Sequence, residues 1–353
     1  MKILFLSSGD RVPSSRYRML PYVRHFRDAG HRCVVASSFP QKYDYFPTIG
    51  FRPSQKLKRL TRWRHWLASR WRRDDVVVID REVFDAPDSF FEERFRRSAR
   101  RLVLDIDDAV FLRYPEKFER LIPMADLVIC GNSFIERWVR EWNESTILIP
   151  TCVEIDEYAG KDWAAATGSR LRVGWIGTPA NLEALHVAAP ALRQLAKRHD
   201  FELLVVTSDA APLQNVELQG VNVRFEAWNA DTDLEQLRQF DIGIMPLRAD
   251  VEWNQFKCGF KLIQYMATAI PAIASPVGVN AEIVSHGVDG YLASSDDDWT
   301  QILEQLIGNP DLRRKVGTAG RETVRQRFSV AAHFPGYEQA LKDLVAGHLL
   351  TGD

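Results

Sequence analysis

Short apolar runs alternate with longer segments of helical period along the whole chain of 353 residues. Each run is only a few residues long and is apolar at consecutive positions, which is typical of strands buried on both faces. Helical segments between such strands predict parallel sheets that are covered on both sides. The first half contains the runs Ile3–Leu6, Cys33–Ala36, Val76–Ile79, Leu102–Ile106, Leu127–Cys130 and Ile147–Ile149. The second half contains Val173–Ile176, Leu203–Thr207, Val221–Phe225, Ile242–Met245 and Pro271–Ala274.

The two series of strands are separated by a stretch of weak periodicity, Glu154–Gly168. We therefore predict an α/β fold with two doubly wound, Rossmann-like domains that face each other across a cleft. The first domain is expected at residues 1–160 and the second at 161–334. The pattern of Val330–Leu350 is helical. We expect the last helix, 335–353, to pack back on the first domain.

Composition limits the class of protein further. Lys and Arg number 46 and Asp and Glu number 47, so the charges nearly cancel. The four cysteines are widely spaced, and no pair has metal-ligand spacing, which predicts a reducing compartment and no zinc site. The apolar run in Met1–Ser8 is too short for a signal peptide. The sequence contains no uncharged stretch of about 18 apolar residues, so it predicts no membrane-spanning helix. We expect a cytoplasmic protein.

Two predicted helix starts in the second half have the features of an anion site. One strand ends at Gly177, and Thr178 is a candidate N-cap for the helix that follows. A second helix begins after Gly259, with Lys257 and Lys261 beside its start. Helix starts offer N–H groups without partners, and the macrodipole favours an anion there. The alternative is a pair of ordinary helices with two solvated lysines.

The segments that follow these lysines resemble one known family. The segments that carry the likeness are Lys261–Pro271, Val277–Val284 with Gly287 and Gly290–Ala293, and Asn309–Arg321 with Phe328 and Ser329. Residues 171–330 thereby resemble the donor domain of retaining glycosyltransferases of family four, the glycosyl transferases group 1, which have the GT-B fold. The resemblance implies transfer of a sugar from a nucleotide-diphosphate-sugar to an acceptor hydroxyl with retention. It also implies no metal, and no cofactor beyond the nucleotide-sugar as co-substrate.

The chain departs from this family at the expected donor site. The family usually carries two glutamates eight positions apart, and their places here hold Phe256 and Gln264. Gln264 can still hydrogen-bond a ribose hydroxyl, because its amide both donates and accepts, whereas Phe256 cannot replace a carboxylate. The family's arginine and lysine after the first strand of the domain are also missing, so we expect Lys257 and Lys261 to supply the charge that a diphosphate requires. The expected donor-binding residues are Gly177, Thr178, Asn181, Lys257, Gly259, Phe260, Lys261 and Gln264, and Lys261 is also expected to be catalytic.

The first domain resembles the acceptor half of the family more loosely. Asp107 and Asp108 follow a strongly apolar strand, near the place where many relatives have a histidine followed by an aspartate. Carboxylates at this position are costly unless they bind a ligand or meet cations. We expect Asp107 and Asp108 to be catalytic and Gly9, Arg16 and Asn132 to lie on the acceptor side. Simple solvation of Arg16 and simple helix capping by Asn132 are the alternatives.

Residues 52–73 contain nine Lys and Arg and no acidic residue. One helical face of this segment carries Leu57, Leu60, Arg64, Leu67 and Trp71. Basic amphipathic helices are typical of contact with anionic membrane surfaces. Nucleic acid is not expected as a partner, because the rest of the chain is balanced in charge and has no recognition module. The alternative is a solvated helix that packs its apolar face on the first sheet.

Two other functions stay open beside the transferase. A non-catalytic binder of nucleotide-sugars is favoured by the missing glutamates. Asp105, Asp107 and Asp108 also resemble the nucleophile loop of magnesium-dependent phosphatases of the haloacid dehalogenase superfamily, although Ala109 stands where threonine or valine is usual. We expect a glycosyltransferase that acts on a glycan or lipid-linked acceptor in the synthesis of cell-surface polysaccharide or glycolipid. Its expected location is cytoplasmic, peripheral on the inner face of the plasma membrane.

Overall fold

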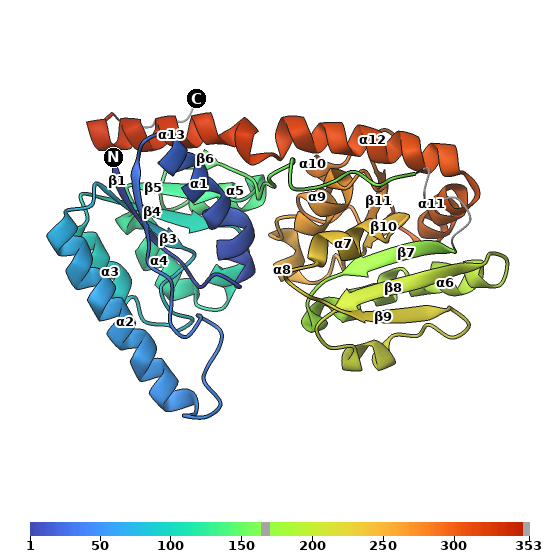
Figure 1. Cartoon of the computed structure of the whole chain (residues 1–353), viewed down its shortest axis with the longest axis horizontal. Coiled ribbons are helices and arrows are strands. Elements are labelled where there is room, and N and C mark those ends of the chain that lie inside the picture. Colours follow the sequence, from blue (N-terminus) through green and yellow to red (C-terminus); the bar gives the residue numbers. More distant parts are fainter. Residues whose placement is uncertain (164–169, 349–353) are drawn as a thin grey trace. The chain divides into compact units, whose positions relative to one another are not determined.

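The computed structural model of the protein describes residues 1–163 and 170–348 (Figure 1). The chain forms two compact units. Unit 1 runs from Met1 to Cys152 and resumes at Val330, and unit 2 is Val153–Ser329. Part of the expected linker, 164–169, and the end of the expected last helix, 349–353, lie outside the described residues.

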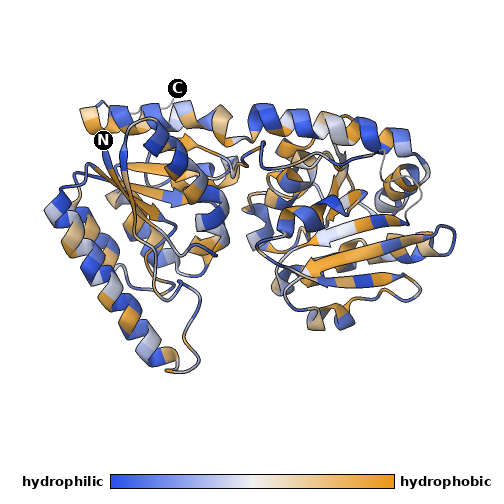
Figure 2. Cartoon of the chain, in the orientation of Figure 1, coloured by the Kyte–Doolittle hydropathy of each residue, from blue (hydrophilic) through white to orange (hydrophobic). Residues whose placement is uncertain are grey.

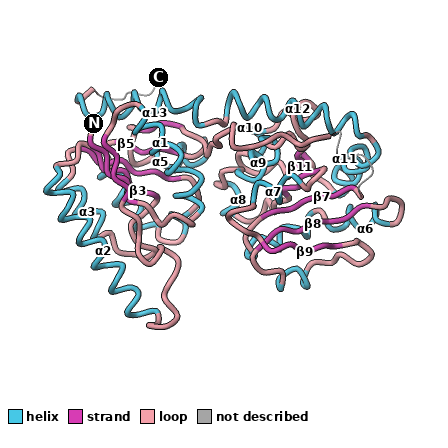
Figure 3. The backbone as a smooth tube through the Cα atoms, in the orientation of Figure 1, coloured by secondary structure: helices cyan, strands magenta, loops and turns pink. Residues whose placement is uncertain are grey.

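Unit 1 contains a parallel sheet of six strands in the order β2-β1-β3-β4-β5-β6. Figure 3 shows the strands in magenta. The strands are β1 Lys2–Leu6, β2 Arg32–Val35, β3 Val76–Asp80, β4 Arg101–Ile106, β5 Leu127–Cys130 and β6 Thr146–Leu148. Each corresponds to an apolar run of the first series. The inner strands are buried on both faces, which is why their sequences are apolar at every position rather than at alternate positions.

The helices of unit 1 cover both faces of its sheet. They are α1 Leu20–Asp28, α2 Phe51–Arg72, α3 Phe90–Ser98, α4 Pro115–Met124, α5 Ser133–Val139 and α13 Val330–Ala346, with the π-helical turn η1 Ser14–Met19 and the 3₁₀ turn η2 Val110–Leu112. The last helix, α13, packs on α1, where the ring of Phe26 lies 5.0 Å from that of Tyr337 and 5.1 Å from that of Phe334. The final helix is therefore part of the core of unit 1.

Unit 2 contains a second parallel sheet of six strands in the order β12-β11-β10-β7-β8-β9. The strands are β7 Leu171–Ile176, β8 Phe201–Thr207, β9 Val223–Ala227, β10 Ile242–Met245, β11 Ala272–Ala274 and β12 Tyr291–Leu292. This is the Rossmann strand order, and the topological switch point lies between β7 and β10. Two glycines allow close packing on this pair, since a Cβ at Gly174 would stand 1.9 Å from Phe240 and one at Gly243 would stand 2.4 Å from Tyr265.

The helices of unit 2 enclose its sheet and bury apolar side chains on both faces (Figure 2). They are α6 Ala189–Ala196, α7 Asp233–Arg238, α8 Glu252–Gln255, α9 Phe260–Ala267, α10 Asn280–Ile283, α11 Asp296–Gly308 and α12 Pro310–Arg327, with the 3₁₀ segments η3 Pro179–Val187 and η4 Ala211–Asn215. The loops that follow β7 and β10 leave the same edge of the sheet, at the switch point. Ligands of open α/β sheets bind at this kind of position.

Candidate donor and acceptor sites

Lys261 lies at the switch point of unit 2, in the first turn of α9. Its ammonium group packs over the ring of Trp175 on β7, with Nζ 4.2 Å from the ring centroid. A Cβ at Gly177 would stand 2.6 Å from the same Nζ. The missing side chain at Gly177 therefore makes the space that the lysine occupies, and the end of β7 and the start of α9 lie in direct contact.

Lys257 joins the same two segments by hydrogen bonds. Its Nζ donates to Oδ1 of Asn181 at 2.8 Å, and Nδ2 of Asn181 donates to Oγ1 of Thr178 at 2.8 Å. The lysine thereby holds the loop after β7 against the segment before α9. The segment after Gly177 is the 3₁₀ segment η3, and the side chain of Thr178 does not cap it, so the predicted N-cap is wrong. The two segments that were predicted separately as helix starts are in contact within unit 2.

Gly259 shapes the start of α9. It has a φ of 65°, in the left-handed region, and a Cβ there would stand 2.3 Å from Cδ1 of Ile283. Only glycine meets both conditions without strain. No side chain caps the first turn of α9. The turn begins with the partly buried Phe260, and the N–H groups of Leu262 and Ile263 donate to the carbonyl of Gly259 at 3.0 and 3.3 Å. The positive end of the helix macrodipole lies at this turn.

The electrostatics of this site favour an anionic ligand. Burial and, to a smaller extent, the charge of Lys257 together lower the pKa of Lys261 to about 7. Within residues 1–163 and 170–348, no carboxylate lies within ion-pair distance of Lys261 Nζ. A partly buried ammonium group beside a second lysine is costly without a counter-charge. A bound anion would supply it.

The two positions that depart from the family lie close to these lysines. Phe256 follows α8 directly. Gln264 lies in α9 and is 5% exposed, and its Nε2 donates to the hydroxyl of Tyr158 at 3.3 Å. The amide nitrogen of Gln264 thus already has a partner in the protein, and its carbonyl oxygen is the atom left for a ribose hydroxyl.

The aspartates at the end of β4 and directly after it in unit 1 are paired with two arginines. Oδ1 of Asp105 accepts from Nε of Arg18 at 2.7 Å, and Oδ1 of Asp107 accepts from Nε of Arg81 at 2.5 Å. Asp108 lies 3.8 Å from Arg81, and its side chain is 25% exposed. The cations that these carboxylates require are therefore supplied by the protein itself.

The pKa values of the two buried aspartates are shifted in opposite directions. Burial raises the pKa of Asp105 to about 6, even though Arg18 opposes the rise. Burial would also raise the pKa of Asp107, but the charge and hydrogen bond of Arg81 outweigh it and lower the pKa. Asp107 is therefore a permanent anion that orients Arg81. It is less open to a ligand than Asp108.

Sequence reasoning missed both arginine partners. Arg18 belongs to the π-helical turn after β1, and Arg81 follows β3 with a φ of 60°, a conformation that non-glycine residues rarely adopt. β1 and β3 are neighbours in the sheet and form its switch point, so both arginines reach the carboxyl edge beside β4. Arg81 directly follows the apolar strand β3, whereas Arg18 lies in η1, well beyond the end of β1, and has no comparable signal in the sequence.

The three residues expected on the acceptor side have different environments. Gly9 has a φ of 131°, and a Cβ there would stand 2.7 Å from Cγ of Gln41. Arg16 lies over the ring of Tyr17, 5.0 Å from its centroid. Asn132 caps α5, because its Oδ1 accepts from the backbone N–H of Ile135 at 2.9 Å. Capping accounts for Asn132, which is 2% exposed.

The two parallel sheets of six strands have the arrangement of the GT-B fold. Residues 170–309 match the family model described as Glycosyl transferases group 1, so unit 2 contains a domain of this family and the predicted resemblance is confirmed. N-acetyl-alpha-D-glucosaminyl L-malate synthase of Bacillus anthracis is 31% identical over 90 residues, which cover 25% of this chain and 23% of that protein. The matched segment spans less than a quarter of the length of the curated relatives.

Solved structures resemble almost the whole chain. Anabaena HepE in complex with UDP-glucose has a TM-score of 0.70 and 16% identity over 97% of this chain and 100% of that chain. Sucrose-phosphate synthase of Thermosynechococcus elongatus has a TM-score of 0.73 and 16% identity over 98% of this chain and 100% of that chain. Likeness at this identity establishes the fold. The predicted GT-B fold class is confirmed.

Proposed function

We propose that the protein transfers a sugar from a nucleotide-diphosphate-sugar to an acceptor hydroxyl, with retention and without a metal ion. The observation that carries the proposal is Lys261, a partly buried cation beside Lys257 with no carboxylate partner in the described chain. A diphosphate would place negative charge between these ammonium groups and the start of α9. Such charge-assisted hydrogen bonds are about twice as strong as neutral ones.

The donor-side residues would act mainly on the leaving group. Negative charge develops on the diphosphate as its bond to the sugar breaks, and fixed cations and N–H dipoles at that position lower the barrier. We propose that Lys257 and Lys261 perform the neutralisation that a divalent cation would otherwise perform. The leaving diphosphate then takes the proton of the acceptor hydroxyl, on the face from which it departs.

On the acceptor side we propose different roles for the two aspartates. Asp108, with its partly exposed side chain, would contact the acceptor. Asp107 would position Arg81, to which it is hydrogen bonded. The magnesium-dependent phosphatase is disfavoured by this pairing, because a metal ion at Asp105 and Asp107 would have to displace guanidinium groups. A non-catalytic binder of nucleotide-sugars would use the same lysine site and is separated from the enzyme only by a transfer assay.

Titration with UDP in the presence of EDTA is expected to show saturable binding coupled to proton uptake. The pKa of Lys261 is lowered to about 7 in the free protein, mainly by burial, and a bound diphosphate would raise it. At about pH 8 the lysine is then mostly neutral when free and protonated when bound, so uptake should approach one proton. The affinity should fall by up to about tenfold per pH unit above pH 7. Calorimetry in two buffers of different ionisation enthalpy measures the uptake.

Two variants control this titration. Lys257→Gln removes the neighbouring charge and should move the onset of proton uptake to higher pH. Lys315→Met changes an exposed lysine of α12 and should leave both affinity and uptake unchanged. The proposal is contradicted if UDP, GDP, ADP and dTDP all fail to bind in EDTA, or if binding releases protons.

We also propose that α2 holds the protein on an anionic membrane, where a lipid-linked or cell-surface glycan acceptor would be found. Two of its basic residues face inward: Lys58 donates to the carbonyl of Lys42, and Arg62 donates to the carbonyls of Ala36 and Ser7. The alternative in which α2 packs its apolar face on the sheet is therefore wrong.

The outward face of α2 combines apolar and basic side chains. Leu60, Leu67 and Trp71 are 58, 48 and 88% exposed. The exposed basic residues of the helix are Arg52, Lys56, Arg59, Arg64 and Arg70. Apolar anchors within a basic surface match the headgroup region of an anionic bilayer. Among the described helices, none has the length and hydropathy to span a membrane.

Trp71→Glu is expected to weaken binding to vesicles that contain phosphatidylglycerol by at least about tenfold. The substitution removes an exposed apolar anchor and adds a charge of the wrong sign. Co-sedimentation with such vesicles measures the loss, and vesicles of phosphatidylcholine alone should bind weakly in every case. Trp142→Glu, at another exposed tryptophan of unit 1, is the matched control. Equal binding of wild type and Trp71→Glu would disprove the membrane role of α2.

A further inference from the structure

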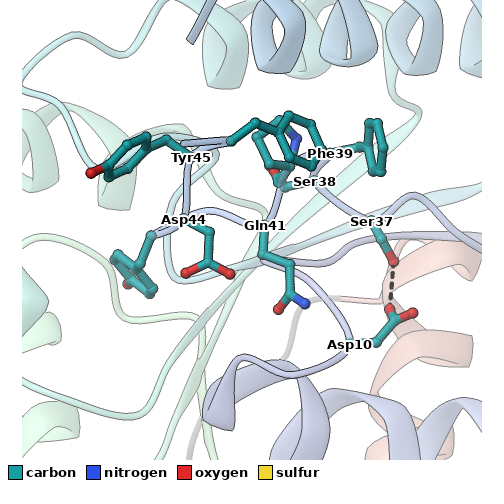
Figure 4. Close-up of a pocket in the computed structure, with 10 residues that line it drawn as sticks. Asp10, Ser37, Ser38, Phe39, Gln41, Asp44 and Tyr45 are labelled. Atoms are coloured by element: carbon teal, nitrogen blue, oxygen red, sulfur yellow. Dashed lines mark hydrogen bonds between the residues drawn. The ribbon is translucent and has the colours of Figure 1, made fainter. Parts of the chain in front are cut away.

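A cavity of about 480 Å³ lies in unit 1, and none of the aspartates and arginines described above belongs to its lining. It is formed by the loop that follows β2, together with Asp10 from the loop after β1 (Figure 4). Its volume is within the range of pockets for small molecules, roughly 300–1,000 Å³. The residues that line it are Asp10, Ser37, Ser38, Phe39, Pro40, Gln41, Tyr43, Asp44, Tyr45 and Phe46.

Half of this lining is aromatic or apolar, and three of its rings are open to solvent. Phe39, Tyr43 and Tyr45 are 57, 43 and 51% exposed. Phe39 packs edge-on against Phe46, and Tyr45 packs edge-on against Phe51, so two of the exposed rings are held by neighbouring rings. Exposed rings that are fixed in place offer flat apolar faces at little cost in entropy.

The polar half of the lining carries hydrogen-bonding groups of both kinds. Asp10 and Asp44 are acceptors, and the amide of Gln41 both donates and accepts. The hydroxyls of Ser37 and Ser38 donate to Asp10 and to the carbonyl of Pro40, so they remain as acceptors. In Figure 4 the side chains of Asp44 and Gln41 extend to the same side of the loop, and Asp10 points toward Ser37. The ten lining residues include two carboxylates and no lysine or arginine, which disfavours a phosphate or any other anion.

Several contacts fix these polar groups before any ligand binds. Oδ1 of Asp10 accepts from Oγ of Ser37 at 2.8 Å, and Oε1 of Gln41 accepts from the backbone N–H of Arg11 at 3.1 Å. Gly9 leaves the space for Gln41, since a Cβ there would stand 2.7 Å from the Gln41 side chain. The amide nitrogen of Gln41 thereby remains as a donor for a ligand. Gly9, which follows β1, thus helps to give this pocket its shape.

We infer that this pocket binds an uncharged sugar ring of the acceptor glycan. A sugar ring has a C–H face that packs on an aromatic ring and a rim of hydroxyls that donate to carboxylates and exchange hydrogen bonds with amides. The exposed rings of Phe39, Tyr43 and Tyr45 and the polar groups of Asp10 and Gln41 supply both kinds of contact. A simple cation would use the rings and carboxylates but not the amide and the serine hydroxyls. The assignment of this sugar to the acceptor rests on the proposed transferase function. Binding of the sugar itself does not depend on that function.

Saturation-transfer NMR on the whole protein tests the pocket without any donor. The probes are the methyl α-glycosides of glucose, galactose, mannose and N-acetylglucosamine, with choline as a competitor. Tyr45→Ala should weaken binding of the preferred glycoside about tenfold, whereas Tyr45→Phe, which keeps the ring, should change it by less than about twofold. Asp44→Asn should also weaken binding. Trp142→Ala removes an exposed ring of unit 1 outside the pocket and should have no effect.

The outcomes separate this inference from the proposed function. Failure of all four glycosides to bind, equal binding to Tyr45→Ala and wild type, or displacement of the glycoside by choline would each overturn the pocket assignment. UDP affinity, measured on the same variants, should be unchanged, because the lysine site belongs to unit 2. Loss of glycoside binding in Tyr45→Ala by a protein that does not bind nucleotides would support the pocket and reject the transferase.

Discussion

Replacement of Lys261 by methionine is expected to weaken UDP binding about 100-fold and to lower the rate of sugar transfer at least as much. The ammonium group is the one that Gly177 and Trp175 hold in place at the start of α9. Methionine keeps most of the chain that packs on Trp175 and removes only the charge and the N–H donors. The loss corresponds to about 2.7 kcal/mol, within the range expected for hydrogen bonds to charged groups.

The same substitution is expected to stabilise the protein when no ligand is present. Lys261 is protonated below its pKa of about 7 in the folded protein, whereas an unfolded chain keeps lysine protonated to about pH 10.4. Its contribution to stability is therefore unfavourable at neutral pH and is relieved as the pH rises above 7. Thermal unfolding at pH 7 should show a higher midpoint for Lys261→Met than for wild type without UDP, and a lower midpoint with saturating UDP.

Lys315→Met is the matched control for the Lys261 substitution, because it removes an exposed lysine of the same unit. It should change neither midpoint by more than the experimental error. A Lys261→Met protein that binds UDP as tightly as wild type would remove the basis of the proposed function. A protein that is destabilised without ligand would instead mean that Lys261 has a favourable partner in the free state.

The strands could be predicted from the sequence because parallel strands are buried on both faces. Val76–Ile79, for example, is apolar at every position and almost fully buried. Tyr291–Leu292, which forms β12, is too short to carry such a signal and gains its structure from pairing with β11. The segments that hold Lys257 and Lys261 could be identified for a related reason, since helix starts and the glycines before them are local features.

The direction in which α2 packs was not predictable from its pattern. Periodicity groups Leu60, Leu67 and Trp71 on one face, and the usual expectation is that an apolar face is buried. In the structure Lys58 and Arg62 lie on the buried face instead, because each donates to backbone carbonyls in segments distant in sequence. The ion pairs of unit 1 were hidden for the same reason. An ion pair between residues of distant segments has no characteristic spacing in the sequence by which it could be recognised.

Asp105→Ala is expected to destabilise unit 1 by about 3–5 kcal/mol. The guanidinium group of Arg18 is 3% exposed and would stay buried without its carboxylate partner. Arg18 also donates to the backbone carbonyl of Ile149, so it cannot turn to solvent without losing a second bond. Chemical or thermal denaturation measures the loss. UDP affinity of the folded protein should not change, because Asp105 lies outside the lysine site.

The ion pair between Arg18 and Asp105 is not expected to add much net stability. A double variant that removes both charges is therefore the control. Burial raises the pKa of Asp105 to about 6 despite the arginine beside it, so placing both charges in the core is costly. The double variant Arg18→Met/Asp105→Leu should therefore recover most of the stability that Asp105→Ala loses. Asp108→Ala, at a partly exposed side chain, should leave stability almost unchanged and reduce transfer instead. An Asp105→Ala protein of normal stability that has lost transfer would assign Asp105 to the reaction and contradict its structural role.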